Sequence, residues 1–320
     1  MEWVSEKLEI CQAGRFLLEN QLVSRTWGNL SILVDDDTFI ISPSGKSYME
    51  TQAKDIAEVE LETLKFHGNS KPSSEMAAHK VIYNGIEDAK ACVHTHQRFV
   101  TAVSVLANSY LQAKKCQKSD KISEKLINTV PQDIGESFAL YGMAGSEQLA
   151  ENIGRAIGRT VKMENSFIIL ANHGAICWGK SMDEAIEVAL NLENKCQRFL
   201  DELGCVYIKG KEFVDFTYKK VGNKYICFAD QPEVKAVKAD SLAGYIDDFG
   251  QIVGESIQIE KDGAVKLEAD NLEDLEAMYE IAGKNALAWQ IASMMNAQAI
   301  PKQYLKEMHQ KYVNYYSKLK

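Results

Sequence analysis

The sequence predicts a globular protein that mixes α-helices and β-strands around a central sheet, in an α/β or α+β arrangement. Two observations predict this class. Helix-like and strand-like periods alternate over the first 200 residues, and clusters of Gly, Pro, Asn, Asp and Ser separate them. The composition, with 46% hydrophobic and 25% charged residues in a chain of 320, is too apolar for a disordered protein.

The helices and strands of the first part of the chain can be placed by their periodicity. Apolar stripes at helical spacing predict helices at about 2–23, 74–84, 97–106, 146–160 and 182–202. Short β-rich runs predict strands at about 30–34, 38–42, 56–61, 90–96, 166–171 and 175–178. The first helix is amphipathic and lacks a basic segment followed by an apolar one, so no signal peptide is expected. The Lys-rich stretch 108–135 is interpreted as a solvated helix with a loop.

The pattern changes beyond residue 204. Residues 205–245 are predicted to be poor in strands and irregular, as in a linker or a wrapping arm. The final segment begins at Pro301 and is predicted to form an amphipathic helix. The expected organisation is a core of residues 1–205 followed by an α+β accessory extension, residues 206–320.

The extension contains what we interpret as a degenerate internal repeat. The segments Asn172–Cys196 and Lys261–Ala286 share the order strand, Gly-Ala turn, short strand and helix, about 90 residues apart. In this interpretation Asp262 occupies the position of His173, so the second copy has lost the imidazole. The alternative, that two unrelated β-α units look alike, is equally consistent with the pattern.

The charge balance and the cysteine content limit the classes of function. A formal net charge of −9 argues against nucleic acid or an anionic membrane as the main partner, but allows a local basic pocket for a phosphorylated small molecule. No run approaches the roughly 18 apolar residues needed to cross a bilayer. The 7 cysteines are scattered without a CxxC pair, which is typical of reduced thiols in a cytosol-like compartment. We therefore expect a cytoplasmic protein.

Three histidines indicate a candidate metal site. His94 and His96 are two residues apart in a β-branched run, so they share one face of a predicted strand. Two imidazoles side by side in a buried strand need a cation or a hydrogen-bond network. His173 follows the apolar run FIILA at a strand end, where functional groups often lie. Three histidines from separate elements are the usual protein ligands of a catalytic zinc ion.

A second candidate site lies where the sequence KPSSE precedes a helix. Ser73 and Ser74 can cap the helix or bind an anion at its N-terminus. Glu75 either complements the helix dipole or acts near the metal as a ligand or as a general acid or base. The turns Gly28-Asn29 and Ser44-Gly45 are ordinary turns when taken singly. Together with the two serines they could supply donors to one phosphate group.

The chain resembles the class II aldolase/adducin-head family, which includes L-fuculose-1-phosphate aldolase. The resemblance covers roughly residues 5–205, and its motifs occur in the family's order and spacing. The matching stretches are SRTWGNLSI (24–32), FIISPSGKSY (39–48), KPSSEMAAHKVIY (71–83), ACVHTHQRFVTAVSVL (91–106) and SFIILANHGAICWG (166–179). The resemblance implies an α/β fold of three layers, with a mixed central β-sheet between helices.

The resemblance also implies a chemistry. A divalent metal, usually Zn²⁺ with Mn²⁺ or Co²⁺ as alternatives, would be held by His94, His96 and His173. Glu75 would be the acid/base carboxylate. The substrate phosphate would be bound by Gly28, Asn29, Ser44, Gly45, Ser73 and Ser74. The implied reaction is reversible C–C cleavage of a ketose 1-phosphate to dihydroxyacetone phosphate and an aldehyde through a metal-stabilised enediolate, catalysed by a cytoplasmic homotetramer.

Other members of the family suggest alternatives. A dehydratase of the methylthioribulose-phosphate type, a decarboxylase and a 4-epimerase share the fold, and a non-catalytic scaffold like the adducin head is a further possibility. Glu75 favours an aldolase or a dehydratase, because the family's epimerases tend to carry Asp there. The family's fuculose aldolases carry a Tyr at the position of Phe138, whereas the nearest tyrosine here is Tyr141.

Overall fold

The computed structural model describes residues 2–24, 26–116, 120–208, 216–237, 244–252, 257–260 and 263–314. An eight-stranded sheet with the order β4-β3-β2-β1-β5-β8-β7-β6 forms the centre of the first 200 residues. Its neighbouring strands are antiparallel except β6 and β7, so the sheet is mixed, as expected. The strands are β1 (Asn29–Leu33), β2 (Thr38–Ile41), β3 (Ala57–Glu60), β4 (Phe66–His67), β5 (Ala91–Thr95), β6 (Phe138–Ala139), β7 (Phe167–Leu170) and β8 (Gly174–Gly179).

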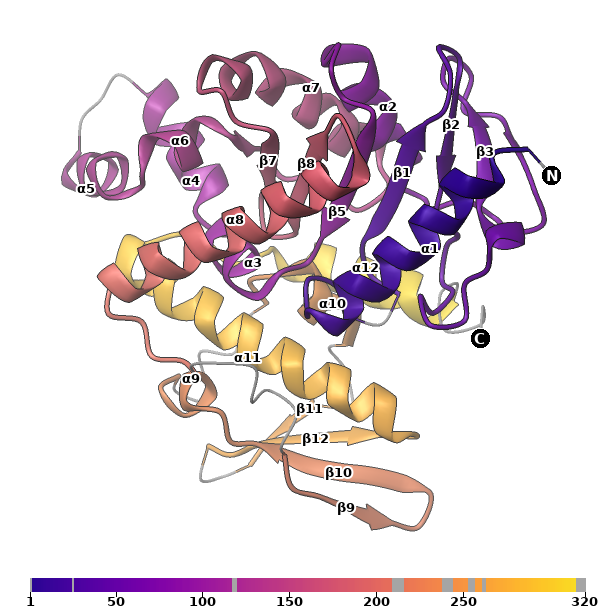
Figure 1. Ribbon diagram of the computed structural model, residues 1–320. Coiled ribbons are helices and arrows are strands. Elements are labelled where there is room, and N and C mark those ends of the chain that lie inside the picture. Colours follow the sequence, from indigo (N-terminus) through magenta and orange to yellow (C-terminus); the bar gives the residue numbers. More distant parts are fainter. Residues whose placement is uncertain are drawn as a thin grey trace.

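Both faces of this sheet are apolar. Phe39 and Ile41 of β2 pack in one hydrophobic cluster, whereas Ile40 between them packs in another. Strands that are buried on both faces need helices on each side. The three-layer α/β arrangement is therefore confirmed (Figure 1), with one face covered by α2 (Met76–Gly85) and α7 (Glu147–Lys162) and the other by α1 (Val4–Glu19), α3 (Arg98–Ser104) and α8 (Met182–Glu202).

The stretch 108–135 holds more helix than predicted. It contains α4 (Ala107–Lys115), α5 (Lys121–Thr129) and α6 (Gln132–Glu136). Asp120 caps helix α5, because its carboxylate accepts hydrogen bonds from the backbone N–H groups of Ile122 and Ser123. Strands β4 and β6 are two residues long and show no period in the sequence.

The C-terminal region is a second α+β unit, with a four-stranded antiparallel sheet in the order β11-β12-β10-β9. Its strands are β9 (Tyr218–Val221), β10 (Lys224–Ala229), β11 (Ile257–Ile259) and β12 (Val265–Ala269). Its helices are α9 (Pro232–Lys235), α10 (Asp247–Ile252), α11 (Leu272–Met295) and α12 (Lys302–Asn314). The predicted C-terminal amphipathic helix is thus observed, although residues 315–320 lie outside the described part.

The prediction that residues 205–245 are poor in strands is wrong. Strands β9 and β10 form a hairpin whose two-residue loop starts at Gly222, with a positive φ of 61°. A Gly-Asn pair between two β-rich runs is a strong hairpin signal, because such tight turns require a positive φ. The remainder of the segment is largely irregular, and residues 209–215 and 238–243 lie outside the described part.

Helix α11 joins the two units. It packs against α3 of the first unit and against β10 and β12 of the second (Figure 1). The largest hydrophobic cluster runs without interruption from Val100 in α3 to Ile281 in α11 and Leu267 in β12. At the same junction the buried Arg98 pairs with Glu233 of α9. The C-terminal region therefore shares the apolar core of the first unit.

The repeat predicted from the sequence remains a prediction. Both segments do contain a strand followed by a capped helix: Ser181 caps α8, and Asn271 caps α11, each through a side-chain oxygen. The proposed equivalence of Asp262 with His173 falls outside the described residues.

Two compositional expectations can be compared with the structure. None of the 7 cysteines, all of which are described, forms a disulfide. Within the described ranges, the helices lack the combination of length and apolar character that a membrane span requires.

Candidate active site

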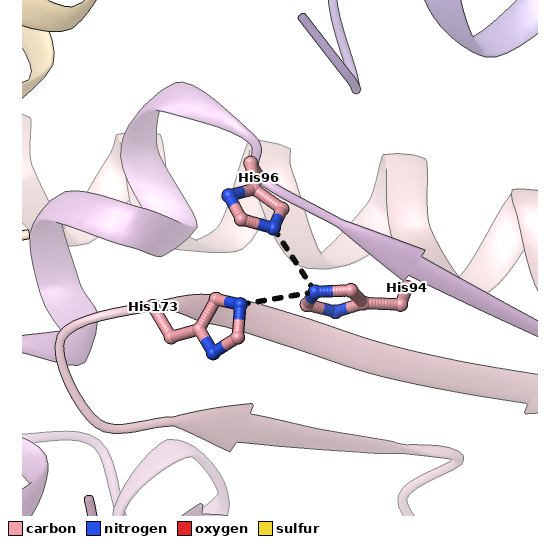
Figure 2. Close-up of side chains that lie close together, drawn as sticks. All are labelled: His94, His96 and His173. Atoms are coloured by element: carbon pink, nitrogen blue, oxygen red, sulfur yellow. Dashed lines mark hydrogen bonds between the residues drawn. The ribbon is translucent and has the colours of Figure 1, made fainter. Parts of the chain in front are cut away.

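Three buried histidines meet at one end of the central sheet (Figure 2). His94 lies in β5, His96 directly follows that strand, and His173 lies in the turn between β7 and β8. The Nε2 atoms of His94 and His96 are 3.0 Å apart, and those of His94 and His173 are 3.2 Å apart. The three side chains are at most 4% exposed. The structure thus brings together the three residues proposed as metal ligands.

The tight turn between β7 and β8 explains how His173 reaches β5. Asn172 adopts a left-handed conformation with φ 59°, which reverses the chain after β7. Gly174 then starts β8 so close to β5 that a Cβ atom there would lie 2.2 Å from the carbonyl oxygen of Thr95. Because glycine permits this close approach, the imidazole of His173 is held beside those of the other two histidines.

The Nδ1 atoms of the first two histidines define their tautomers. Nδ1 of His94 donates to the carbonyl oxygen of Ala175 at 2.9 Å, and Nδ1 of His96 donates to the carboxylate of Asp248 at 2.7 Å. In the neutral rings both Nε2 atoms therefore carry lone pairs. Two lone pairs facing each other at 3.0 Å repel unless a cation or a proton lies between them.

The pKa values favour the neutral form that binds metals. Burial lowers the pKa of His94 and lowers that of His173 to about 3, against the opposing effect of the nearby Glu75 carboxylate. A tetrahedral zinc ion with Zn–N bonds of about 2.0–2.1 Å separates its nitrogen ligands by roughly 3.3 Å. The observed separations of 3.0 and 3.2 Å are close to that value, so the cluster fits a divalent cation.

Glu75 lies beside this cluster and immediately precedes α2. Its Oε2 lies 3.2 Å from Nε2 of His94 and accepts a 2.9 Å hydrogen bond from Nδ2 of Asn29. Its Oε1 lies 3.6 Å from Nε2 of His173 and has no hydrogen-bond partner among the described residues. Glu75 makes no side-chain hydrogen bond that caps α2, so the structural alternative of a capping role is not observed.

The carboxylate of Glu75 is held ionised. Burial alone would raise its pKa, but the imidazoles of His94 and His173 and the hydrogen bond from Asn29 outweigh that effect and lower the pKa to about 2. A charged, buried carboxylate with one oxygen oriented and the other unsatisfied is suited to accept a proton or to approach a cation.

A chain of hydrogen bonds fixes Asn29, and through it Glu75. The Oδ1 atom of Asn29 is hydrogen-bonded to Nε2 of His79. Nδ1 of His79 is bonded to Ser31 Oγ at 2.6 Å, and Ser31 is bonded to Tyr83 at 2.6 Å. The sequence analysis assigned Asn29 to the phosphate, but the structure shows its side chain engaged by the carboxylate and the imidazole.

The histidine cluster opens into a cavity of about 830 Å³. The cavity walls include Glu75, His96 and His173 together with all six residues proposed to bind phosphate, which are Gly28, Asn29, Ser44, Gly45, Ser73 and Ser74. The sequence analysis missed two cationic residues on the same walls, Lys46 and Lys71.

The loops that carry these residues are joined by backbone hydrogen bonds. Ser44 N donates to Lys71 O at 2.9 Å, and Ser73 N donates to Ser42 O at 3.1 Å. Gly28 has a φ of 85°, and a Cβ there would lie 2.6 Å from His94 O, so this turn requires glycine and contacts the histidine strand directly. The serine and glycine loops and the histidine cluster therefore form one connected site.

The C-terminal region also reaches the site. Asp247, Asn271, Glu273 and Met308 line the cavity, and Asp248 binds His96. Asp248 is completely buried, and although burial raises its pKa, the interactions with His96 and Lys284 hold the pKa below its ordinary value. No signal in the sequence distinguishes this acidic pair from a solvated one.

Comparison with known proteins identifies the family. Residues 8–200 match the Class II Aldolase and Adducin N-terminal domain. The chain belongs to this family. Within the class II aldolase family, it is 29% identical over 194 residues to the 5-deoxy-D-ribulose 1-phosphate aldolase of Bacillus thuringiensis, covering 59% of this chain and 81% of the relative. It is 30% identical over 206 residues to the probable L-ribulose-5-phosphate 4-epimerase UlaF of Mycoplasma pneumoniae, covering 61% and 80%.

A solved structure of an L-fuculose 1-phosphate aldolase confirms the class II aldolase fold. It aligns with a TM-score of 0.51 at 23% identity, covering 64% of this chain and 89% of that one. The family match ends at residue 200, so the part of the cavity wall formed by Asp247, Asn271, Glu273 and Met308 lies outside it.

Neither Phe138 nor the nearby Tyr141 is among the residues that line the cavity. Phe138 is completely buried in β6 and packs edge-on against Tyr110. Tyr141 lies between Asp247 and Tyr304, and burial together with the charge of Asp247 raises the pKa of its hydroxyl far above the ordinary value. Its neutral hydroxyl therefore lies near the acidic end of the site.

Proposed function

We propose that this chain is a metal-dependent sugar-phosphate aldolase that reversibly cleaves a ketose 1-phosphate to dihydroxyacetone phosphate and an aldehyde. The observation that carries the proposal is the convergence of three buried imidazoles and the ionised Glu75 at one end of a cavity lined by serine and glycine loops. Family membership supports it, since relatives of this chain act on phosphorylated sugars by name.

The cation we propose is Zn²⁺, with Mn²⁺ or Co²⁺ as substitutes. His94, His96 and His173 would hold it, because all three offer buried nitrogen atoms toward one point. A divalent cation at that point supplies Lewis-acid stabilisation of the negative charge that develops on substrate oxygen when a carbon–carbon bond breaks.

Glu75 is the proposed proton carrier. Asn29 holds its Oε2, which leaves Oε1 facing the histidines and the cavity. In the condensation direction Glu75 accepts a proton from the carbon beside the substrate carbonyl. In the cleavage direction it returns that proton to the same carbon.

The serine and glycine loops are the proposed phosphate site. Their backbone and hydroxyl donors line one side of the cavity, and Lys46 and Lys71 add positive charge there. Phosphate binding at a distance from the breaking bond orients the substrate and lowers the entropic cost of reaction.

The decisive experiment is a substrate panel. Purified protein loaded with Zn²⁺ is incubated with ketose 1-phosphates, and dihydroxyacetone phosphate is measured by its coupled reduction with NADH. We expect release of dihydroxyacetone phosphate from at least one of them, and its complete absence across the panel would contradict the aldolase proposal. Loss of water without cleavage would identify the dehydratase. The decarboxylase needs a separate substrate that carries a carboxylate, such as 3-oxo-tetronate 4-phosphate, and would release carbon dioxide from it.

The 4-epimerase is the second candidate, supported by the similarity to the probable L-ribulose-5-phosphate 4-epimerase. Incubation with L-ribulose 5-phosphate followed by ¹³C NMR distinguishes it, because epimerisation inverts one carbon centre and releases no fragment. A chain that binds no divalent cation would support the scaffold alternative and would contradict both enzymatic proposals.

A further inference from the structure

Among the described residues, the shortest contact from the C-terminal region to an imidazole of the histidine cluster is made by Asp248. Oδ1 of Asp248, in α10, accepts the 2.7 Å hydrogen bond from Nδ1 of His96. The two residues are 152 positions apart in the sequence, and Asp248 lies beyond the part of the chain that the family match covers. Both side chains are at least nine-tenths buried.

A wholly buried carboxylate is costly unless it is paired. The Oδ2 atom of Asp248 has no hydrogen-bond partner among the described residues, so His96 is the one hydrogen-bonding side chain recorded for this carboxylate. Such a group is hard to explain by stability alone, because replacing a buried polar pair by apolar side chains is often neutral or stabilising. Its position behind a candidate ligand suggests a role in the metal centre.

The backbone around Asp248 is fixed to the turn that carries His173 and to α11. Asn172, which precedes His173, donates from Nδ2 to Tyr245 O at 2.7 Å and accepts from Asp247 N at 2.8 Å. The amide of Asn285 in α11 accepts a 2.8 Å hydrogen bond from Tyr245 N. The α10 segment is therefore held in register with the turn that carries His173.

A second contact from the C-terminal region fixes the backbone of His96. The fully buried Lys284 of α11 donates from Nζ to His96 O at 2.8 Å, and it also pairs with Glu280 at 2.8 Å. His96 is thus held at its imidazole by α10 and at its carbonyl by α11. All of these contacts lie within a single chain.

We propose that Asp248 is a positioning residue of the metal centre: by accepting the Nδ1 proton of His96, it fixes the tautomer and the ring orientation that present Nε2 to the cation. A carboxylate behind a ligating histidine acts in this way in metalloproteins, and its loss typically lowers metal affinity by about 10- to 100-fold. This inference rests on the proposed metal centre, but it does not depend on which sugar phosphate is cleaved.

The test measures metal affinity in the full-length chain, with Co²⁺ alone as the probe. Apoprotein is titrated with Co²⁺ in competition with a chromophoric chelator, and the visible d–d absorption of bound Co²⁺ reports the coordination geometry. The variants are Asp248→Ala, which removes the acceptor, and Asp248→Asn, which keeps an acceptor oxygen and removes the charge. The matched control is Asp230→Asn, since Asp230 is a carboxylate of the same region that hydrogen-bonds Tyr279 and not a histidine.

We expect Asp248→Ala to bind Co²⁺ about 10- to 100-fold more weakly than the wild type, with an altered d–d spectrum. The loss of Co²⁺ affinity in Asp248→Asn should be smaller. Asp230→Asn should match the wild-type affinity. Thermal unfolding of the apoproteins shows whether Asp248→Ala folds. If it does not, the isosteric Asp248→Asn provides the test, and both its Co²⁺ affinity and its d–d spectrum should differ from those of the wild type.

Two results would overturn the inference. The first is wild-type Co²⁺ affinity and spectrum in the folded Asp248 variants, and the second is an equal loss in Asp230→Asn, which would indicate a general effect on the C-terminal region. Failure of the wild-type chain to bind Co²⁺ is a different outcome, because it would remove the proposed metal centre and the proposed function with it.

Discussion

Glu75 gives the sharpest expectation at the scale of a single residue. Replacement by Gln keeps the shape of the side chain and removes its capacity to accept a proton. We expect Glu75→Gln to retain the cation and to lose about 10²- to 10⁴-fold in turnover, which is the usual contribution of general acid–base catalysis. Metal content by mass spectrometry and initial rates of dihydroxyacetone phosphate release provide the check. Full activity would remove Glu75 from the mechanism.

His173 tests the cluster itself. His173→Ala removes one of three imidazoles, and we expect the purified variant to lose its stoichiometric cation, with a fall in affinity of more than about 100-fold. The matched control is His67→Ala, because the side chain of His67 is 76% exposed. Elemental analysis after dialysis measures both variants. Unchanged metal content in His173→Ala would show that the third ligand is misassigned.

Asp55 is hydrogen-bonded to Lys46 in the cavity wall, and its contribution to the stability of the fold should depend on pH. The carboxylate accepts hydrogen bonds from Lys46 Nζ at 2.7 Å and from Gln52 N at 2.9 Å. Burial raises the pKa of Asp55, but these bonds outweigh it and hold the pKa below its ordinary value. The stabilisation is therefore present above the unfolded-state pKa of about 3.9 and is lost as the pH falls through the folded-state value.

We expect Asp55→Asn to lower the free energy of unfolding by about 1 to 2 kcal/mol at neutral pH. The difference from the wild type should shrink as the solution is acidified below the ordinary pKa of an aspartate. Urea denaturation over a series of acidic to neutral buffers gives both values. A difference that stays constant with pH would contradict the charge-based explanation.

At the scale of elements, the close packing of β8 against β5 leads to a stability prediction. A Cβ at Gly174 would lie 2.2 Å from Thr95 O, so Gly174→Ala must push the two strands apart. We expect a loss of about 1 to 3 kcal/mol in the free energy of unfolding, together with weaker metal binding. The control is Gly158→Ala in α7, where a Cβ meets nothing within 4 Å and the helix should gain up to about 1 kcal/mol.

Helices and strands whose apolar residues recur at a clear period could be predicted from the sequence. The shared strand face of His94 and His96 could be predicted in the same way. A two-residue spacing places His94 and His96 on one face of a strand whatever the rest of the chain does. The two-residue strands β4 and β6 show no period, whereas the β9–β10 hairpin does carry a signal in its Gly222 turn. The local sequence pattern thus predicts whether a segment is a helix or a strand, but not which other segments it packs against.

At the scale of the whole molecule, the sequence could not place Asp248 in the site. Nothing near this residue marks it as buried, and its partner His96 lies 152 residues earlier. His173 was proposed as a third ligand from its strand-end position and family resemblance, while its distance to His94 is set only by strand pairing between β5 and β8. Contacts of this kind depend on tertiary packing across the whole chain.

The shared core yields a prediction at the same scale. A chain that ends at residue 205 would expose the apolar face of α3 and leave Arg98 without Glu233. We expect this truncated chain to lose cooperative unfolding and high-affinity Co²⁺ binding, because the apolar surface that the C-terminal region covers would be left exposed to water. Circular dichroism melting and the Co²⁺ titration test this. A stable, metal-binding fragment would show that residues 206–320 are a dispensable accessory.

The long sequence separation between His96 and Asp248 has a consequence during translation. At a synthesis rate of about 5 to 20 residues per second, the 152 intervening residues take roughly 8 to 30 seconds to translate. During that interval the nascent chain carries His94 and His96 without the carboxylate to which His96 is hydrogen-bonded. The hydrogen bond between His96 and Asp248 can therefore form only after α10 has been synthesised and has left the ribosome.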